Sequence, residues 1–390
     1  MTIKHFSLFI LIFVSLFFSS CRAEKKLLEK EDLFVISMGV MADELDYFYR
    51  DNSLLPGNSD LFVQNGRIFL TSSHAGKIME MNSYGDLLSL VYNPQKNPEP
   101  SHFIKQDNQD ESLIRIQKWN FRNIEHIAIS DEAMLVVDQV DETLAILSDQ
   151  VLYNRIILRF DEEGHYIDSL GQEGINGTPF SYVKDLQITA QGDAVVVTQS
   201  AADNTVFWFS SEGQLLFQVN MDKEHLPKVD EEGWSIGHAE KIAADQSEYK
   251  LYIKVDYFPI EDSPEQQALS RLYTLDLQDE EYTGFFDVSR FEISLGEQLI
   301  EGVNEYLGPI SGGLHFFMGS DYNGEYHLTI MDNEGAVKTS RILNIQDQDI
   351  IFKKLYLSPN GLLTGIFYED KGARVSWWRA DHVAGKYAQN

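Results

Sequence analysis

The chain has 390 residues, of which 61 are acidic, 31 are Lys or Arg and one is cysteine, and its formal net charge is −30. A negative field of this size repels the backbone of nucleic acids and anionic lipid headgroups, so the composition argues against nucleic-acid binding. One cysteine cannot form an internal disulfide, and a domain of this length can be stabilised by burial alone.

The first feature in chain order is an apolar segment, residues 6–18, which follows a basic residue and precedes two serines and Cys21. Its 13 residues are too few to cross a hydrocarbon core, which takes about 20 residues of helix. A short basic start, an apolar stretch and small residues before a cut are typical of an export signal. We therefore expect residues 1–20 to be a signal peptide that is removed.

Cys21 after two small residues resembles the lipobox of bacterial lipoproteins, whose cysteine is acylated and becomes the new N-terminus. Phe18 stands where that family usually has Leu, a relaxation that spirochaetal lipoproteins often show. The resemblance implies lipidation at Cys21, of the palmitate type, and export to a bacterial membrane. The alternative is an ordinary cleaved signal peptide that leaves a free cysteine. Residues 21–32 are charged and lack Gly and Pro, so they are predicted to be a spacer before the folded domain.

From about residue 60 the chain alternates short apolar strands with turns, and no long amphipathic helix is predicted. One pattern recurs, a strand followed by a polar turn that ends in glycine, and its clearest copies end at Gly85, Gly164, Gly213 and Gly335. Glycine supplies the positive φ that a tight hairpin requires. Each copy follows another hairpin, so the full unit has four strands in about 40–50 residues, which is typical of a β-propeller blade.

Residues 171–195 resemble the NHL repeat in their glycines, Phe180, the strand at 185–188 and the return after Gly192. The resemblance extends loosely over residues 54–380 and implies a propeller similar to the six-bladed propeller lipoproteins of several bacterial groups. Six copies of the pattern predict six blades. The 79 residues between the anchors Met81 and Phe160 leave a seventh blade as the alternative.

The ring is predicted to close by pairing of its two ends. The last copy, at residues 375–378, has no fourth strand of its own, whereas residues 33–40 form an apolar strand without a partner. Pairing them removes two exposed edges. The predicted fold is therefore an all-β, six-bladed propeller over residues 33–390, and we expect a monomer.

Recognisable catalytic motifs are absent from the sequence, including the nucleophile elbow, the zinc-binding HExxH motif and phosphate-binding glycine loops. One constellation remains, because the residue before the inner strand is acidic in four repeats: Asp60, Glu125, Asp185 and Glu240. Inner strands of a propeller line its central channel, so these carboxylates are predicted to gather at one mouth and attract a cation or a basic ligand. The alternative is that they are strand-edge residues screened by solvent and by lysines.

These observations predict a non-enzymatic binding or scaffold module at a bacterial envelope, with another protein or a small ligand as partner. Membrane contact is expected through the lipid alone, and no metal or cofactor is expected. Trp119, flanked by Lys118 and Arg122, is the candidate exposed contact residue. The alternative function is a metal-dependent hydrolase, because the acidic positions resemble those with which gluconolactonase-like propellers hold calcium.

Overall fold

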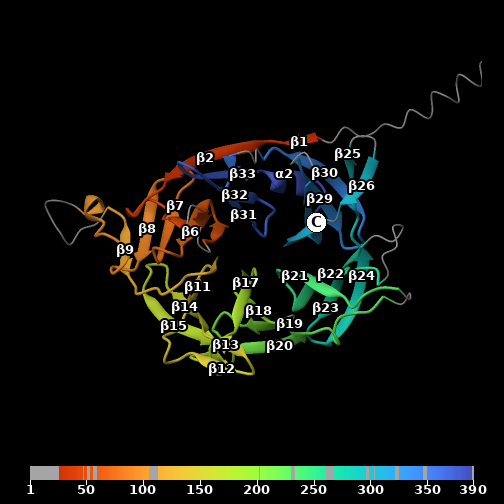
Figure 1. The fold of residues 1–390 in the computed structure, drawn as a ribbon, viewed down its shortest axis with the longest axis horizontal. Helices are drawn as coiled ribbons and strands as arrows, with labels where there is room; N and C mark the ends of the chain where they lie inside the picture. The colour runs from red at the N-terminus through yellow and green to blue at the C-terminus, as the bar shows by residue number, and fades with distance from the viewer. Residues whose placement is uncertain are drawn as a thin grey trace, which may run out of the picture.

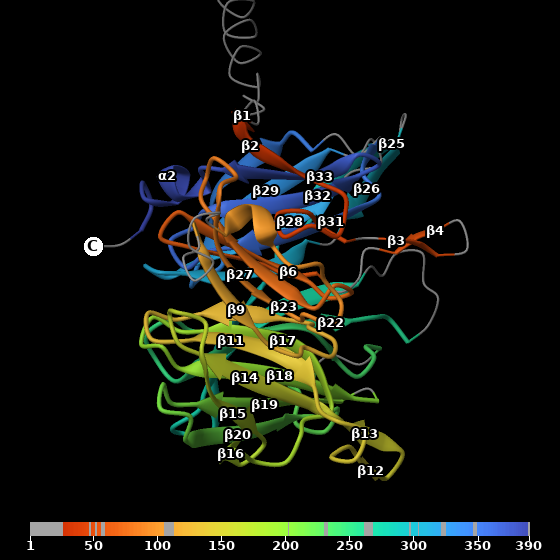
Figure 2. The same ribbon diagram turned by 90° about the vertical axis from the view of Figure 1, so that its left-hand side faces the viewer.

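The computed structural model describes residues 26–46, 48–50, 53–55, 59–104, 113–201, 203–229, 233–260, 268–295, 298–302, 304–320, 325–345 and 349–388. Within these residues, six sheets of four or five strands stand around a central axis and form a six-bladed β-propeller (Figure 1). Figure 2 shows the ring from its edge, with β1 and β2 on the rim.

The first three blades follow one another in the sequence, each starting with its innermost strand. Blade 1 contains β5 (Leu61–Gln64), β6 (Arg67–Ser72), β7 (Lys77–Met81), β8 (Leu87–Tyr92) and β9 (Arg115–Lys118). Blade 2 contains β10 (Ile127–Ile129), β11 (Met134–Gln139), β14 (Arg155–Phe160), β15 (Tyr166–Gly171) and β16 (Gly174–Ile175). Blade 3 contains β17 (Tyr182–Ile188), β18 (Ala194–Ser200), β19 (Asp203–Phe209) and β20 (Leu215–Met221).

The last three blades complete the ring, and two of them take strands from the N-terminal part of the chain. Blade 4 contains β21 (His238–Ala244), β22 (Lys250–Tyr257), β23 (Leu269–Asp276) and β24 (Glu281–Asp287). Blade 5 contains β27 (Glu305–Ile310), β28 (Leu314–Ser320), β29 (Tyr326–Asp332), β30 (Val337–Leu343) and β1 (Lys26–Leu28). Blade 6 contains β31 (Phe352–Leu357), β32 (Leu363–Glu369), β33 (Gly372–Trp378) and β2 (Lys30–Ser37).

Short hairpins and helices are attached to this ring. In the described part of the chain, three two-stranded hairpins lie outside the blades: β3 (Phe48–Arg50) with β4 (Ser53–Leu55), β12 (Ile146–Ser148) with β13 (Val151–Tyr153), and β25 (Phe291–Leu295) with β26 (Gln298–Gly302). The short helices are η1 (Ser101–Phe103) and α2 (Ala380–Ala384). Among the described residues, no helix combines the length and apolar character needed to cross a bilayer.

Closure of the ring by its two ends is confirmed. β2 runs antiparallel to β33, with Lys30 opposite Trp378 and Ser37 opposite Gly372. β1 adds a parallel strand to the outer edge of blade 5. The propeller therefore starts earlier than predicted, because residues 26–32, assigned above to the spacer, lie largely within β1 and β2.

The long interval between the first two anchors does not contain a seventh blade in its described part. It contributes β9, which pairs in parallel with β8, and the separate hairpin of β12 and β13. The prediction of six blades is therefore confirmed.

The predicted glycine turns join the third and fourth strands and contact the preceding blade. Gly85, Gly164, Gly213 and Gly335 have φ values of 87°, 86°, 88° and 80°. A Cβ atom at Gly85 would lie 2.9 Å from the Phe34 side chain, and one at Gly213 would lie 2.7 Å from Leu170. Glycine is therefore required at these turns both for the positive φ and for the close approach of neighbouring blades.

The core lies between adjacent blades. Strands such as β18 are apolar on both faces, because a neighbouring blade covers each face. One cluster joins blades 1 to 3 and includes five fully buried or nearly buried rings: Phe121, Phe160, Phe180, Phe207 and Phe209. Burial of such side chains stabilises the fold by roughly 1.5–3 kcal/mol each.

Candidate functional site

The six inner strands surround a cavity of about 250 Å³ in the central channel. Five blades each place an ionisable side chain in its lining near the start of the inner strand. We call these residues the channel row: Asp60, His126, Asp185, Lys241 and Lys354. Blade 5 contributes the uncharged residues Leu307 and Gly308 to the same lining.

β-Bulges decide which residues reach this row. The register of β17 shifts at Lys184, that of β21 shifts at Glu240, and the backbones of Glu125 and His126 both bond to Val137. A bulge sets two residues of one strand against one residue of its partner and changes the direction of the side chains. The bulge residues of blades 2, 3 and 4 are therefore Glu125, Lys184 and Glu240, and each directly precedes a residue of the channel row.

The structure brings two of the four predicted acidic residues together. Asp60 and Asp185 line the same cavity, whereas Glu125 and Glu240 do not belong to its lining. At the equivalent places the channel row holds His126 and Lys241, so the mouth combines both signs of charge. The expectation of an acidic ring is corrected here, because the acidic residue is the bulge residue in blades 2 and 4.

Glu125 and Glu240 have partners away from the cavity. The side chain of Glu125 is 2% exposed, and its two oxygens accept hydrogen bonds from Arg155 Nη2 at 2.6 Å and Arg155 Nε at 3.1 Å. A carboxylate oxygen of Glu240 lies 3.2 Å from Lys254 Nζ. Both residues therefore form ion pairs within their own blade.

Asp60 is the most constrained member of the channel row. Its Oδ1 lies 2.8 Å from Lys354 Nζ, and its Oδ2 lies 3.3 Å from His126 Nδ1. The backbone amides of Leu61 and Ile127 also donate to its carboxylate. Burial raises the pKa of Asp60, but Lys354 and His126 outweigh burial and hold this pKa well below its usual range. Asp60 is therefore ionised and neutralised by its neighbours.

The same contacts act on the cations. Burial lowers the pKa of His126, but the hydrogen bond and charge of Asp60 outweigh burial and raise it above its usual value. Burial also lowers the pKa of Lys354, but the carboxylates of Asp60 and Asp185 outweigh burial and raise this pKa above its usual value. The channel row is therefore a mutually stabilised set of charges.

Asp185 forms the second ion pair of the mouth. Its Oδ2 lies 2.5 Å from Lys241 Nζ and accepts a hydrogen bond from Gln187 Nε2 at 2.9 Å. Burial raises the pKa of Asp185, and the charge of Lys241 outweighs it and lowers the pKa below its usual range. Each aspartate of the cavity thus has a lysine of its own.

This set of side chains does not fit the calcium site that the resemblance to gluconolactonase-like propellers implied. Calcium takes six to eight oxygen ligands. The two cavity aspartates already contact ammonium groups, and a third lysine, Lys184, lines the same space. A cation placed among them would face three positive charges.

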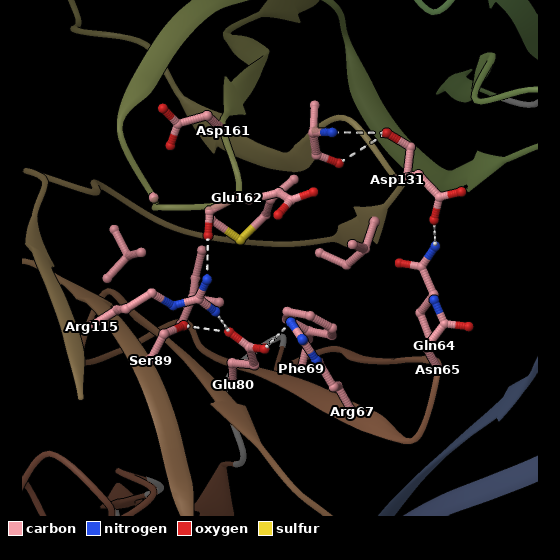
Figure 3. A pocket seen from close by; sticks show the side chains of 17 residues that line it. Gln64, Asn65, Arg67, Phe69, Glu80, Ser89, Arg115, Asp131, Asp161 and Glu162 are labelled. Carbon is pink, nitrogen blue, oxygen red and sulfur yellow. Dashed lines mark hydrogen bonds and ion pairs between the residues drawn. The ribbon is translucent and has the colours of Figure 1, made fainter. Parts of the chain in front are cut away.

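A second cavity, of about 390 Å³, lies between blades 1 and 2 (Figure 3). On the blade 1 side, Glu80 accepts hydrogen bonds from Arg67, Ser89 and Arg115. On the blade 2 side, the turn after β14 brings Glu162, whose carbonyl accepts a hydrogen bond from Arg115. The sequence carried no signal for this cavity, because its polar residues come from separate strands without a motif.

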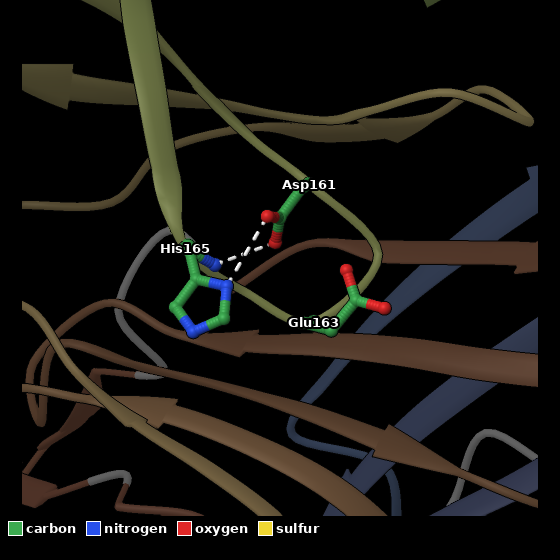
Figure 4. Close-up of side chains that lie close together, drawn as sticks. All are labelled: Asp161, Glu163 and His165. Carbon is green, nitrogen blue, oxygen red and sulfur yellow. Dashed lines mark hydrogen bonds and ion pairs between the residues drawn. The ribbon is translucent and has the colours of Figure 1, made fainter.

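Asp161, Glu163 and His165 gather on the turn between β14 and β15 (Figure 4). Both imidazole nitrogens of His165 have protein neighbours, Asp161 Oδ2 at 3.2 Å and Gln117 Nε2 at 3.0 Å. The backbone N–H of His165 also donates to Asp161. These bonds fix the turn against β9, and the cluster is explained by them without a metal ion.

Trp119 is a packing residue rather than the exposed contact residue that its charged neighbours indicated. It is half-buried, stacks on Tyr166 with ring centroids 4.5 Å apart, and meets Phe160 edge to face at 5.5 Å. Cys21, the predicted lipidation site, lies outside the described residues.

No family model matches the chain, and no curated protein matches it. Solved structures similar to it include U3-55K, with 11% identity, a TM-score of 0.43, and 89% of this chain and 98% of that one covered. The β-propeller domain of the trilobed protease from Pyrococcus furiosus has 11% identity, a TM-score of 0.39, and 82% and 83% coverage. The WD40 domain of coronin from Toxoplasma gondii has 7% identity, a TM-score of 0.40, and 92% and 90% coverage.

Proposed function

We propose that this protein is an exported lipoprotein, anchored through Cys21, whose propeller binds a ligand at the channel mouth without transforming it. The channel row is the observation that supports binding best, since five blades place an ionisable side chain around one cavity. Buried ion pairs are weak contributors to stability, because the loss of hydration offsets their attraction. Charges collected in a cleft are therefore better explained by a ligand than by the fold.

The carboxylates support binding over hydrolysis. A general base works best when its pKa lies near the operating pH. Although burial raises the pKa values of Asp60 and Asp185, their lysine partners lower both below the usual range. These two carboxylates are therefore suited to holding cations of the protein in place and poorly suited to accepting a proton from water.

The position of the first strand supports an anchor that leaves the channel open. β1 starts at Lys26, five residues after Cys21, and lies on the outer edge of blade 5. Figure 2 shows β1 and β2 on the rim of the ring. A lipid on Cys21 would thus hold the propeller by its rim and leave the channel mouths accessible.

Two measurements test this proposal. Cys21→Ala should abolish incorporation of labelled lipid and release the protein from membranes, and labelled lipid on the variant would overturn the anchor. For the binding function, small molecules retained by protein purified from envelopes should be recovered unchanged, and Lys241→Gln should lose them while the exposed-site control Lys223→Gln keeps them. Conversion of the retained compound during incubation with the protein would overturn the non-enzymatic proposal.

A further inference from the structure

We propose that the ligand of the channel mouth is a small anion whose carboxylate or phosphate group binds between the ammonium groups of Lys184 and Lys241. This inference rests on the proposed function of the channel as a binding site, and it names the chemical class of the ligand.

The cavity carries an excess of positive charge inside a strongly acidic protein. Its lining holds three lysines, Lys184, Lys241 and Lys354, against two aspartates. One ammonium charge is therefore unbalanced even with His126 neutral, whereas the whole chain has a formal charge of −30. A local excess of positive charge of this kind attracts anions into the cavity, although the net charge of the protein repels them.

Lys184 carries this unbalanced charge. Lys354 pairs with Asp60 and Lys241 pairs with Asp185, but Lys184 Nζ donates to the backbone carbonyl of Glu240 at 3.0 Å. Among the described residues, no carboxylate oxygen lies within ion-pair distance of Lys184. The Glu240 carboxylate lies 3.2 Å from Lys254 Nζ, which Asp256 contacts more closely at 2.9 Å, so Glu240 acts on Lys184 only from a longer distance. An ammonium group has three donors, and the described residues accept one hydrogen bond from Lys184, so the proposed anion would accept from the other two.

The surroundings of Lys184 make its charge costly without an anion. Burial lowers the pKa of Lys184, and the neighbouring ammonium of Lys241 lowers it further, although Glu240 and Asp185 partly oppose both effects. An anion placed between the two lysines would relieve their repulsion and form charge-assisted hydrogen bonds with both.

The bulge in β17 is the structural device that creates the site. Val183 pairs with Thr198 and Asp185 pairs with Val197, so Lys184 is the extra residue between them. In a regular strand, neighbouring side chains point to opposite faces. Because of the bulge, Lys184 and Asp185 both reach the cavity.

The volume of the cavity limits the size of the ligand, and one buried acceptor in its lining has no hydrogen-bond partner among the described residues. Its volume of about 250 Å³ lies below the roughly 300–1,000 Å³ of pockets for drug-sized ligands. Gln246 also lines it, and among the described residues the buried Oε1 of this side chain has no hydrogen-bond partner. The ligand is thus a small carboxylate or phosphate compound with room for a second group that donates a hydrogen bond to Gln246 Oε1.

Titration calorimetry of the purified protein with inorganic phosphate and, separately, with succinate tests the inference at low ionic strength. We expect saturable binding of at least one titrant at one site per chain, weakened by added salt. Lys184→Gln should lower the affinity by at least about tenfold, the loss expected for one charge-assisted hydrogen bond. Lys184→Arg, which keeps the charge, should retain most of the affinity, and Lys223→Gln should retain all of it.

The two titrants separate the two anion classes, and thermal unfolding supplies an independent readout. The bound anion should raise the melting temperature of the wild type and of Lys223→Gln, and not that of Lys184→Gln. Absence of binding by both titrants, or equal affinity in Lys184→Gln, would overturn the anion site, while a compound retained unchanged through Lys241 would still support the proposed function. Anion binding at Lys184 accompanied by turnover of an ester would leave the site standing and overturn the non-enzymatic function.

Discussion

At the rim of the ring, β2 completes blade 6 by antiparallel pairing from Lys30 to Ser37 with one bulge at Leu33. At the channel mouth, bulges in the inner strands decide which ionisable side chains line the cavity. The rim buries apolar side chains such as Ile36 and Val375, while the mouth gathers charges whose partners come from other blades. We therefore expect the rim to contribute mainly to stability, and the proposed function assigns recognition to the mouth. This division predicts large stability effects at the rim and small ones, coupled to binding, at the mouth.

The largest effect is expected from deletion of residues 30–37. The deletion removes the outer strand of blade 6, leaves β33 as an exposed edge and uncovers buried side chains such as Val375. We expect a loss of about 5 kcal/mol or more, which equals much of the stability of a typical domain, together with aggregation. Thermal unfolding measures this loss.

A matched control is provided by the hairpin of β12 and β13, which lies outside the blades and is largely exposed. Replacing residues 146–153 by a short turn should change the melting temperature little. If the variant without residues 30–37 melted within a degree or two of the wild type, the rim would not be the main source of stability.

The second effect concerns Glu125, which lies next to the channel row but outside its cavity. Arg155→Met should leave the nearly inaccessible carboxylate of Glu125 without its cationic partner, and it should lower the free energy of unfolding by about 3 kcal/mol. The double variant Glu125→Leu with Arg155→Met should recover most of this loss, because it removes the uncompensated charge. Denaturant midpoints measure both values, and an unchanged midpoint in Arg155→Met would contradict the ion pair. Anion binding should stay unchanged in the double variant.

The third effect is smaller and falls on the channel row. Lys354→Met removes one partner of Asp60, but the carboxylate keeps His126 and the backbone amides of Leu61 and Ile127. We expect a loss of about 1–2 kcal/mol, below that for Arg155→Met, measured by the same denaturant midpoints. A loss larger than that for Arg155→Met would mean that the mouth, too, is built for stability.

The contrast between rim and mouth also explains how much the sequence could reveal. The turns at Gly85 and Gly213 were predictable because hairpin chemistry is local, and ring closure was predictable because each end of the chain had an unpaired apolar strand. The charges that line the mouth were not predictable, because a shift by one residue moves a side chain to the other face of a strand. The bulges that cause this shift have no recognisable sequence pattern. The sequence pattern therefore indicated Glu125, whereas the next residue, His126, lines the channel.

Two further differences have the same origin in distant contacts. Residues 26–32 are charged, and they were assigned to a spacer because their strand partners lie more than 300 residues away, at Arg341 and Trp378. Trp119 has charged neighbours in the sequence, yet it packs on Tyr166 from the next blade. Local composition describes the exposure of such residues poorly when their partners belong to another repeat.

The smallest effect is a pH dependence carried by His126, which faces Asp60, Asp185 and Lys354. Burial lowers the pKa of His126, but the carboxylate of Asp60 outweighs it, so the folded pKa lies above the unfolded value of about 6.5. A group with a raised folded pKa stabilises the protein below its unfolded pKa, and this stabilisation is lost as the pH rises through the folded pKa.

Asp60, with its lowered pKa, contributes in the opposite sense, and the stabilisation that it provides is lost only at acidic pH, as the pH falls through the folded pKa. Within the channel row, the change in stability between about pH 5.5 and pH 8 therefore belongs mainly to His126. We expect His126→Gln, which keeps a donor toward Asp60 but does not titrate, to be less stable than the wild type near pH 5.5 and to approach it near pH 8. Melting temperatures of both proteins across this range measure the difference, and parallel curves would show that the charge of His126 does not contribute to the mouth.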